Sequence, residues 1–461
     1  MTTQGPVERY IVGVNTANVE LALSAFGSDA EITDDGKSYR GDGIRLFVEH
    51  GVIGHKASVK VLAQEILPDG RTYLHVLMDG DFAAEFGITE PFELFLVFTI
   101  KENKIQHVDM GDVDPKKDTV WTVYAAGANL DDPLSSIRVR RRNAPPPKEG
   151  YVRVRMQAVG LNFHDIFTLR GLGMHKIKFP MILGNEGAGV LDDGTEVALY
   201  PNLGDSDFKG DETIDPKRHV LGEIEQGTLA EYIWVPKRNA VPRPGGLNAQ
   251  VASVMGVAWL TAFRMMFVKA NLRPGQTVLV QGSSGGMFSN PLFVTHTNGN
   301  FAGVTTALIQ LGSAAGYRVW TTGRTEAKRA IAKHLGAEQT FEPLQTLPRL
   351  VDAVFDTSGA ATINHSIAST KPGGTVVICG IHSEGGATKV PVDMFPILVN
   401  QINLTGVYTG TREEFGDLLN FVAEKGIKPY IGRVLPLEKA EEGLRDIYEG
   451  KTQGKIVITI S

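Results

Sequence analysis

A glycine-rich turn follows an apolar strand near the middle of the chain. Residues 278–281 read V-L-V-Q, and the turn G-S-S-G-G comes directly after them. Glycines let backbone N–H groups approach a diphosphate closely, and the N-terminus of a following helix favours anions. The apolar run that begins at Val304 supplies such a helix, although the third glycine position of this motif is Thr305 here. We therefore predict a dinucleotide site whose residues are Gly282, Ser283, Ser284, Gly285, Gly286 and Val304.

Residues 287–303 interrupt this turn. They have neither helical nor strand periodicity and contain the breaker pairs Asn290-Pro291 and Asn298-Gly299. Without them, strand, turn and helix run on in one register. Codons that fit Gly286-Met287, Thr297-Asn298 and Ala302-Gly303 can contain a splice donor, a branch sequence and an acceptor, so our hypothesis is a translated, unspliced intron. The alternative is a genuine inserted loop that alters or abolishes the cofactor site.

The strand that should follow this helix, residues 317–322, indicates which nicotinamide cofactor binds. An NAD site places a carboxylate after this strand, whereas an NADP site places Arg or hydroxyl groups there. No Asp or Glu ends the strand; Thr322, Arg324 and Lys328 stand there instead. NADPH is therefore favoured over NADH. The alternative is that Arg324 and Lys328 are solvated residues at the start of a helix.

The composition is that of a multi-domain globular enzyme. The 461 residues carry a net charge of -6, which gives no basic footprint for nucleic acid or an anionic membrane. The first residues lack a signal-peptide pattern and no apolar run is long enough to cross a bilayer, so we expect a cytoplasmic protein that acts on a small molecule. The single cysteine, Cys379, lies in an apolar strand and is expected to be a core residue rather than a nucleophile.

Residues 7–114 form one unit by pattern. Helical periodicity covers residues 7–25 and 41–52, with a short strand at 30–33 between them. Four further strands are predicted at 58–67, 71–78, 92–100 and 104–110. Helices followed by a meander predict an α+β cone over a curved sheet.

This unit resembles the SnoaL-like, ketosteroid-isomerase-like family. The resemblance rests on V-E-R-Y-I from Val7, A-F-G-S-D-A-E-I-T-D-D-G from Ala25 and Y-R-G-D-G-I from Tyr39. It implies an apolar pocket in which Tyr10 and Asp34 carry out proton transfer. The sequence departs from the isomerases because the strand at 93–98 is apolar where a second, protonated acid is needed. The alternative is that Asp34 ends a strand at a turn and Tyr10 packs in the core.

Period-two strands resume after residue 118, and one of them carries an arginine run. We expect Arg138, Arg140, Arg141 and Arg142 to form a solvated sheet edge. Beyond them, A-V-G-L-N-F-H-D at 158–165, F-P-M-I-L-G-N-E-G-A-G at 179–189, G-T-L-A-E-Y-I at 227–233 and the glycine turn resemble the medium-chain dehydrogenase/reductase superfamily. The resemblance implies a GroES-like β-barrel catalytic domain and an α/β Rossmann domain with a parallel sheet.

Zinc enzymes of this superfamily have a Cys and a His where this chain has Asn162 and Asn185. Neutral amides are poor zinc ligands, so the resemblance points to the zinc-independent branch of quinone oxidoreductases and enoyl reductases. Asn162 is expected to position the nicotinamide ribose or the substrate oxygen. Asp165, Asn185 and Glu186 are expected to hold a polar network in the cleft; the alternative is that they make purely structural hydrogen bonds in turns. Thr261, at the start of a long helix, matches the family's residue near the nicotinamide. Gly380 follows a strand of the parallel sheet and is expected to permit close approach to the nicotinamide.

Two details of the cleft stay open in the sequence. His164 and His175 could donate a proton, but neither has a partner visible in the sequence. Residues 202–225 are polar and irregular, and either cap the substrate cleft or form an inert surface loop.

The predicted domains are residues 1–115 (SnoaL-like cone), 118–255 (GroES-like), 256–407 (Rossmann, with the insert) and 408–461 (return to the catalytic domain). The predicted function is NADPH-dependent, zinc-independent reduction of an activated C=C or C=O, with a homodimer as one assembly. The alternative is a catalytically silent scaffold whose first domain is a binding or dimerisation module, or an isomerase or cyclase.

Overall fold

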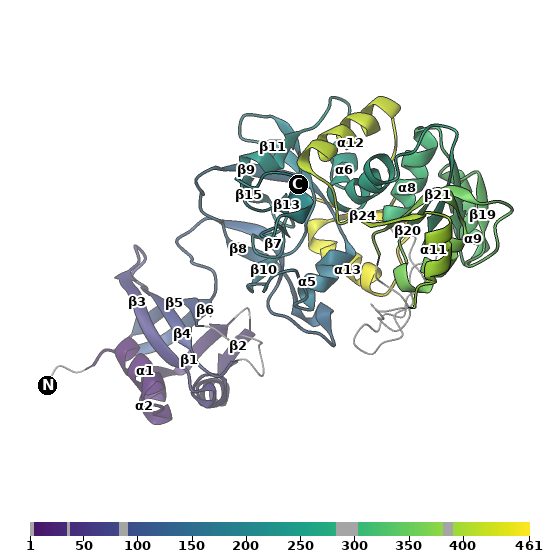
Figure 1. Cartoon of the computed structure of the whole chain (residues 1–461). Coiled ribbons are helices and arrows are strands. Elements are labelled where there is room, and N and C mark those ends of the chain that lie inside the picture. The colour runs from purple at the N-terminus through teal and green to yellow at the C-terminus, as the bar shows by residue number, and fades with distance from the viewer. Residues whose placement is uncertain (1–3, 35–36, 83–90, 283–302, 381–390) are drawn as a thin grey trace. The chain divides into compact units, whose positions relative to one another are not determined.

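The computed structural model describes residues 4–34, 37–82, 91–282, 303–380 and 391–461. Two compact units are present (Figure 1). Unit 1 comprises Met1–Trp121 and Arg140–Ala144, and unit 2 comprises Thr122–Val139 and Pro145–Ser461. Each unit has its own apolar core.

Unit 1 is built on a six-stranded sheet in the order β2-β1-β6-β5-β4-β3. All neighbours are antiparallel except β1 and β6, which are parallel. The predicted meander is confirmed, and its four strands agree with the predicted bounds to within a residue or two. The strands are β1 (Phe26–Asp34), β2 (Lys37–Arg40), β3 (Ser58–Ile66), β4 (Thr72–Asp79), β5 (Phe92–Lys101) and β6 (Lys104–Gly111).

The helices of unit 1 differ from the prediction in one respect. The single helical run expected at 7–25 is two helices, α1 (Pro6–Asn15) and α2 (Val19–Leu23). The break occurs because Ala17 adopts a left-handed conformation and the Asn18 side chain accepts the N–H of Leu21, which starts a new helix. Helix α3 (Asp42–Leu46) continues as a π-helical turn to Val52, as the prediction for 41–52 required.

The first part of unit 2 has the GroES-like arrangement. Its main sheet has the order β16-β12-β11-β9-β24-β23, with β15 paired to β9. The last strand of the chain, β24, lies antiparallel to β9, so the C-terminus returns to this domain as predicted. The strands are β9 (Tyr151–Gly160), β11 (Ala188–Leu191), β12 (Glu196–Leu199), β15 (Tyr232–Pro236), β16 (Ala240–Pro242), β23 (Ile431–Pro436) and β24 (Lys455–Thr459).

The second part of unit 2 is a six-stranded parallel sheet in the order β19-β18-β17-β20-β21-β22. Adjacent residues along β17 point into two different apolar cores: Val278 and Val280 into one, and Leu279 into the other. The sheet is therefore covered on both faces, as a Rossmann-like fold requires. The strands are β17 (Thr277–Gln281), β18 (Arg318–Thr322), β19 (Gln339–Phe341), β20 (Val351–Asp356), β21 (Thr370–Ile378) and β22 (Asn403–Gly406).

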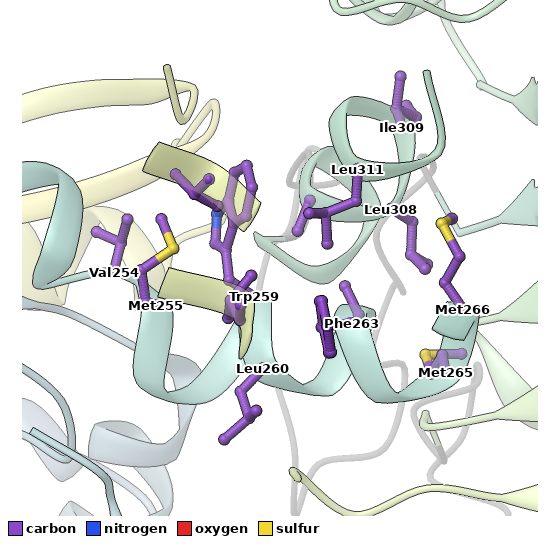
Figure 2. Close-up of a cluster of buried hydrophobic side chains, with 14 of the residues drawn as sticks. Val254, Met255, Trp259, Leu260, Phe263, Met265, Met266, Leu308, Ile309 and Leu311 are labelled. Atoms are coloured by element: carbon purple, nitrogen blue, oxygen red, sulfur yellow. The ribbon is translucent and has the colours of Figure 1, made fainter. Parts of the chain in front are cut away.

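One continuous helical stretch packs against the helix that follows β17. It runs from Met255 through α7 (Leu260–Phe263) to Lys269, with π-helical turns on both sides of α7. Figure 2 shows its side chains, among them Trp259, Phe263 and Met266, against Leu308 and Leu311 of α8 (Gly303–Ala314). This packing holds α8 against the helical stretch. No helix in the described ranges has the length and apolarity needed to cross a membrane.

Candidate active site

The site is organised at the N-terminus of helix α5 (Phe163–Leu169). The Asn162 backbone N–H donates to Asp165 Oδ2 at 2.9 Å, and the Asp165 N–H donates to the Asn162 backbone oxygen at 3.1 Å. The other oxygen, Asp165 Oδ1, accepts the Gly184 N–H at 2.8 Å. Burial raises the pKa of Asp165, while the two backbone hydrogen bonds to its carboxylate oppose the rise. Asp165 thus fastens the start of α5 to the loop that carries Asn185 and Glu186.

Four polar side chains meet beside this cap. Lys455 Nζ, which is buried, donates to Leu161 O at 2.7 Å, Asn162 Oδ1 at 2.6 Å and Glu186 Oε1 at 2.7 Å. Asn162 Nδ2 donates to Asn185 Oδ1 at 3.0 Å and Glu186 Oε1 at 2.9 Å. The structure therefore brings the predicted residues Asn162, Asn185 and Glu186 together. Lys455 joins them and was missed; its only signal was a charged residue at the head of the apolar strand K-I-V-I-T.

Glu186 also links this cluster to the helical stretch of Figure 2. It is fully buried, and its Oε2 accepts the N–H of Val257 at 2.8 Å. Thr261 lies one turn further on, in the interior of the stretch rather than at its start as predicted, and its hydroxyl donates to Val257 O at 2.8 Å. A hydrogen bond thus joins the polar cluster directly to the helical stretch that packs against α8.

His164 has the partner that could not be seen in the sequence. Its Nε2 lies 3.0 Å from Glu223 Oε1, and its Nδ1 lies 3.1 Å from Asn185 Nδ2. Burial tends to raise the pKa of Glu223, but hydrogen bonds from His164 and from the backbone N–H groups of Val220 and Met174 outweigh it and lower the pKa below its ordinary value. His175 does not contact Glu223 through its ring: its Nε2 lies 2.9 Å from Arg218 O, while the N–H of the preceding Met174 lies 3.4 Å from Glu223 Oε1. Glu223 was also missed, because its distance from His164 along the chain hides the pair.

Residues 202–225 fold largely on themselves. Strands β13 (Asn202–Leu203) and β14 (His219–Val220) pair, and the segment with Arg238 encloses a polar cavity of about 290 Å³. Buried Arg264 anchors the segment through ion pairs to Asp211 and to Glu414. Glu223 is the residue through which the segment touches the cluster around His164. The segment is thus anchored to the rest of unit 2 by Arg264 and by Glu223.

The cofactor side of the site begins at the end of β17. Gly282 has φ +111°, and a Cβ there would overlap Thr357 Oγ1, so only glycine fits. Ser283, Ser284, Gly285, Gly286 and the insert up to residue 302 lie outside the described residues. Helix α8 starts at Gly303, and Val304 in its first turn packs on the core of unit 2. Strand and helix therefore flank the predicted turn as expected.

Two cationic residues follow β18, where the sequence places a ribose-reading group. Lys328 is buried, and burial together with the charge of Arg324 lowers its pKa. The two cations are thus close to one another after the buried Thr322. The alternative that both are solvated residues is wrong for Lys328, which α9 (Glu326–His334) turns inward, whereas Arg324 is exposed as that alternative expects.

Two predictions about single residues of unit 2 have definite outcomes. A Cβ at Gly380 would overlap Thr357 O, so this glycine permits close approach to a neighbouring loop of the protein itself. That gives a different reason for the glycine from the predicted approach to the nicotinamide. Cys379 is half-buried against the core of unit 2, and burial, with a contribution from the Asp356 charge, raises its pKa to about 12, which disfavours a nucleophilic thiolate.

Unit 1 brings Tyr10 and Asp34 near one another. Tyr10 is buried between Phe26 and Phe98, and its pKa is raised by burial and by the Asp34 charge. Burial also raises the pKa of Asp34, against the charges of Lys37 and Arg140, with a further rise from Asp112. Asp112 is a carboxyl that the sequence analysis did not single out.

The arginine run is not a simple solvated edge. Arg138 and Arg141 are exposed, but Arg140 and Arg142 are half-buried and pair with Asp112 at 2.6 Å and 3.9 Å. Alternation along β8 (Ile137–Asn143) sends these two side chains inward, where a carboxylate offsets their charge.

Two protein-family models match parts of unit 2. Residues 148–245 match the model of the alcohol dehydrogenase GroES-like domain, and residues 303–424 match that of the zinc-binding dehydrogenase domain. This part of the chain belongs to the medium-chain dehydrogenase/reductase family. It is an oxidoreductase family, and the second match starts at Gly303, the residue that ends the insert.

Individual relatives agree with this family. A zinc-type alcohol dehydrogenase-like protein of Schizosaccharomyces pombe is 26% identical over 333 residues, 68% of this chain and 91% of the relative. Quinone oxidoreductase of Mus musculus is 25% identical over 338 residues, again 68% and 91%. A solved NAD-dependent alcohol dehydrogenase is 29% identical with a TM-score of 0.63, over 74% of this chain and all of that one. A crotonyl-CoA carboxylase/reductase, at 20% identity and a TM-score of 0.63, shares the fold.

The capping role of Asp165 predicts a stability effect. Asp165→Asn offers one oxygen where two backbone N–H groups need acceptors, so one donor is left unsatisfied in the interior. We expect a loss of about 1–3 kcal/mol of unfolding free energy, measured by urea denaturation. Asp193→Asn is the matched control: Asp193 also accepts a backbone N–H, from Thr195, but in an exposed turn. Equal effects of the two substitutions would contradict the capping role.

Proposed function

We propose that the chain is an NADPH-dependent, zinc-independent reductase of an activated C=C or C=O. The observation that carries the proposal is the buried ammonium of Lys455 among Asn162, Asn185 and Glu186. It supports an enzyme of this oxidoreductase family whose cleft is organised by the protein's own charges and hydrogen bonds.

Zinc does not fit this set of side chains. Asn162 and Asn185 offer neutral amides, and the acceptor atoms Asn162 Oδ1 and Glu186 Oε1 are taken by an ammonium group. A cation at that point repels a second cation, and an ammonium has no lone pair to donate to a metal. Among the described side chains, no group of three or more His, Cys, Asp or Glu is arranged around a metal position.

NADPH fits the residues after β17 and β18. The backbone at Gly282 and the N-terminus of α8 suit a diphosphate, and Arg324 with Lys328 suits the 2′-phosphate. The cost of holding Lys328 inward beside Arg324 is offset when an anion binds between them. When bound, NADPH supplies the hydride.

The substrate class follows from the same arrangement. As hydride adds, negative charge develops on the substrate oxygen, and hydrogen-bond donors must stabilise it. Lys455 and Glu186 form a buried ion pair whose ammonium donors are all used within the protein, so this pair holds the surrounding side chains in place. His164 with Glu223 provides a half-buried polar group near it. Enones, quinones and related carbonyl compounds are acceptors of this kind, in line with the quinone oxidoreductase relatives.

The insert gives a direct test of the proposal. We expect a chain lacking residues 287–303 to bind NADPH and to oxidise it in the presence of enone or quinone acceptors, measured by NADPH fluorescence and absorbance. The full chain should bind NADPH far more weakly, because the turn no longer leads directly into α8. A shortened chain without NADPH binding would rule out the reductase. Equal binding by both forms, or retention of the segment in most mature transcripts, would show that the insert is a genuine loop.

The phosphate role of Arg324 and Lys328 predicts a change of cofactor preference. In the shortened chain, Arg324→Gln with Lys328→Gln should raise the KM for NADPH roughly a hundredfold, about tenfold for each charged hydrogen bond lost, with little change for NADH. Lys333→Gln, an exposed lysine on the same helix, is the control. Parallel losses for NADPH and NADH would mean that the two cations do not read the 2′-phosphate.

For unit 1 we propose a SnoaL-like domain that moves a proton next to a carbonyl. The electrostatic effect of Asp34 on Tyr10 supports it: a carboxyl with a raised pKa suits a base, and a buried hydroxyl near it suits an oxyanion donor. Asp34 would take a proton α to the carbonyl and return it at the γ carbon.

This role predicts that Asp34→Asn lowers the isomerisation of a β,γ-unsaturated ketone by about 10²–10⁴-fold, followed by absorbance of the conjugated product. Asp29→Asn, an exposed position on the same strand β1, should have no effect. If the Asp34→Asn variant keeps the full isomerase rate, or if neither the variant nor the unaltered chain isomerises the ketone, unit 1 is a binding or dimerisation module instead.

A further inference from the structure

A single hydrogen-bond chain runs through unit 2 from Lys455 to Glu223. Lys455 Nζ donates to Asn162 Oδ1 at 2.6 Å, and Asn162 Nδ2 donates to Asn185 Oδ1 at 3.0 Å. Asn185 Nδ2 then meets His164 Nδ1 at 3.1 Å, and His164 Nε2 meets Glu223 Oε1 at 3.0 Å. Every member except His164 is almost fully buried.

The donor-to-acceptor direction of this series of hydrogen bonds is fixed at Lys455. An ammonium group has three donors and no acceptor, so Asn162 must present its oxygen to Lys455. Its amide nitrogen then points to Asn185, and Glu186, which can only accept when ionised, holds that nitrogen in the same sense at 2.9 Å. Asn185 must in turn present its oxygen to Asn162 and its nitrogen to His164. The Nδ1 atom of His164 is therefore left as an acceptor.

We propose that Lys455 is a positioning residue for His164: through Asn162 and Asn185 it keeps Nδ1 without a proton. The ring then stands in the site as a neutral imidazole whose Nε2–H donates to Glu223. This assigns a role to Lys455, Asn185 and Glu223 that the reductase proposal does not contain.

The assignment is not what the nearest carboxylates would produce. Glu223 contacts the ring, and Asp165 is close enough that a charge on His164 lowers the pKa of Asp165. Both carboxylates therefore favour an imidazolium. A proton on Nδ1 would face the amide nitrogen of Asn185. If the Asn185 amide rotates so that its O and N exchange places, the Asn185 nitrogen faces the Asn162 nitrogen. If the Asn162 amide rotates in the same way, the Asn162 nitrogen faces the Lys455 ammonium. Each alternative leaves two donors opposed in the interior, which is costly.

The consequence is a site with one fixed cation and a neutral donor. The aliphatic part of Lys455 lies next to α8, since a Cβ added at Gly303 would lie 3.0 Å from Lys455 Cδ, while its ammonium group is held by Leu161, Asn162 and Glu186. His164, at the other end, contributes an N–H without a second positive charge.

The test is the ring nitrogen spectrum of the uniformly ¹⁵N-labelled full chain at neutral pH, with the His164 signals assigned by their loss in His164→Gln. We expect one protonated nitrogen, Nε2, and an unprotonated Nδ1. In Lys455→Met with Glu186→Gln, which removes both charges together, Asn162 and Asn185 can turn over. Both nitrogens of His164 should then carry protons. The His175 ring, bonded to Arg218 O, is the internal control and should not change.

A second variant keeps the test decisive if the double variant does not fold. Asn185→Asp leaves Lys455 and Glu186 in place but puts an acceptor beside Nδ1, so His164 should become doubly protonated. A protonated Nδ1 in the unaltered chain, or an unprotonated Nδ1 retained in the double variant or in Asn185→Asp, would overturn the proposal. The measurement needs neither NADPH nor substrate, so its outcome is separate from that of the reductase proposal.

Discussion

The ammonium group of Lys455 is enclosed by protein, and a buried charge is stable only when its hydrogen bonds and its countercharge are supplied on the spot. Leu161 O, Asn162 Oδ1 and Glu186 Oε1 meet both needs. This requirement orients the side chains around it. Asn162 and Glu186 cannot turn away without leaving the charge unpaired, and Asn185 and His164 are set by Asn162 in turn.

The same cluster ties together segments that are distant in the sequence. Lys455 stands on β24, the closing strand, while Asn162 caps α5 and Glu186 is bonded to Val257 of the helical stretch that packs on α8. The polar end of the catalytic domain and the helix expected to receive a diphosphate are therefore held by one set of contacts. Orientation of this kind is what a protein contributes to hydride chemistry that belongs to the cofactor.

Unit 1 illustrates a different balance of charge. Arg140 and Arg142 reach inward to Asp112, and Asp34 lies within the field of the same groups. The carboxyl of Asp34 keeps a raised pKa because burial outweighs the nearby cations. Only side chains brought together from β1, the end of β6 and β8 produce this result, so the arginine run could not be interpreted from its spacing alone.

Local patterns in the sequence determined the elements and their order. Period-two alternation located the meander of unit 1, and the motifs around Asn162 and Asn185, with the strand and helix on either side of the glycine turn, located the fold of unit 2, because these patterns depend on neighbours within a few residues. The sequence pattern did not predict the break between α1 and α2, because the apolar periodicity continues past the Asn18 cap. The partners of His164, the burial of Lys328 and the place of Lys455 were decided only by the tertiary structure. Each depends on a contact between residues far apart in the chain. The sequence alone does not show whether a charged side chain is paired with an opposite charge in the interior or is exposed to solvent.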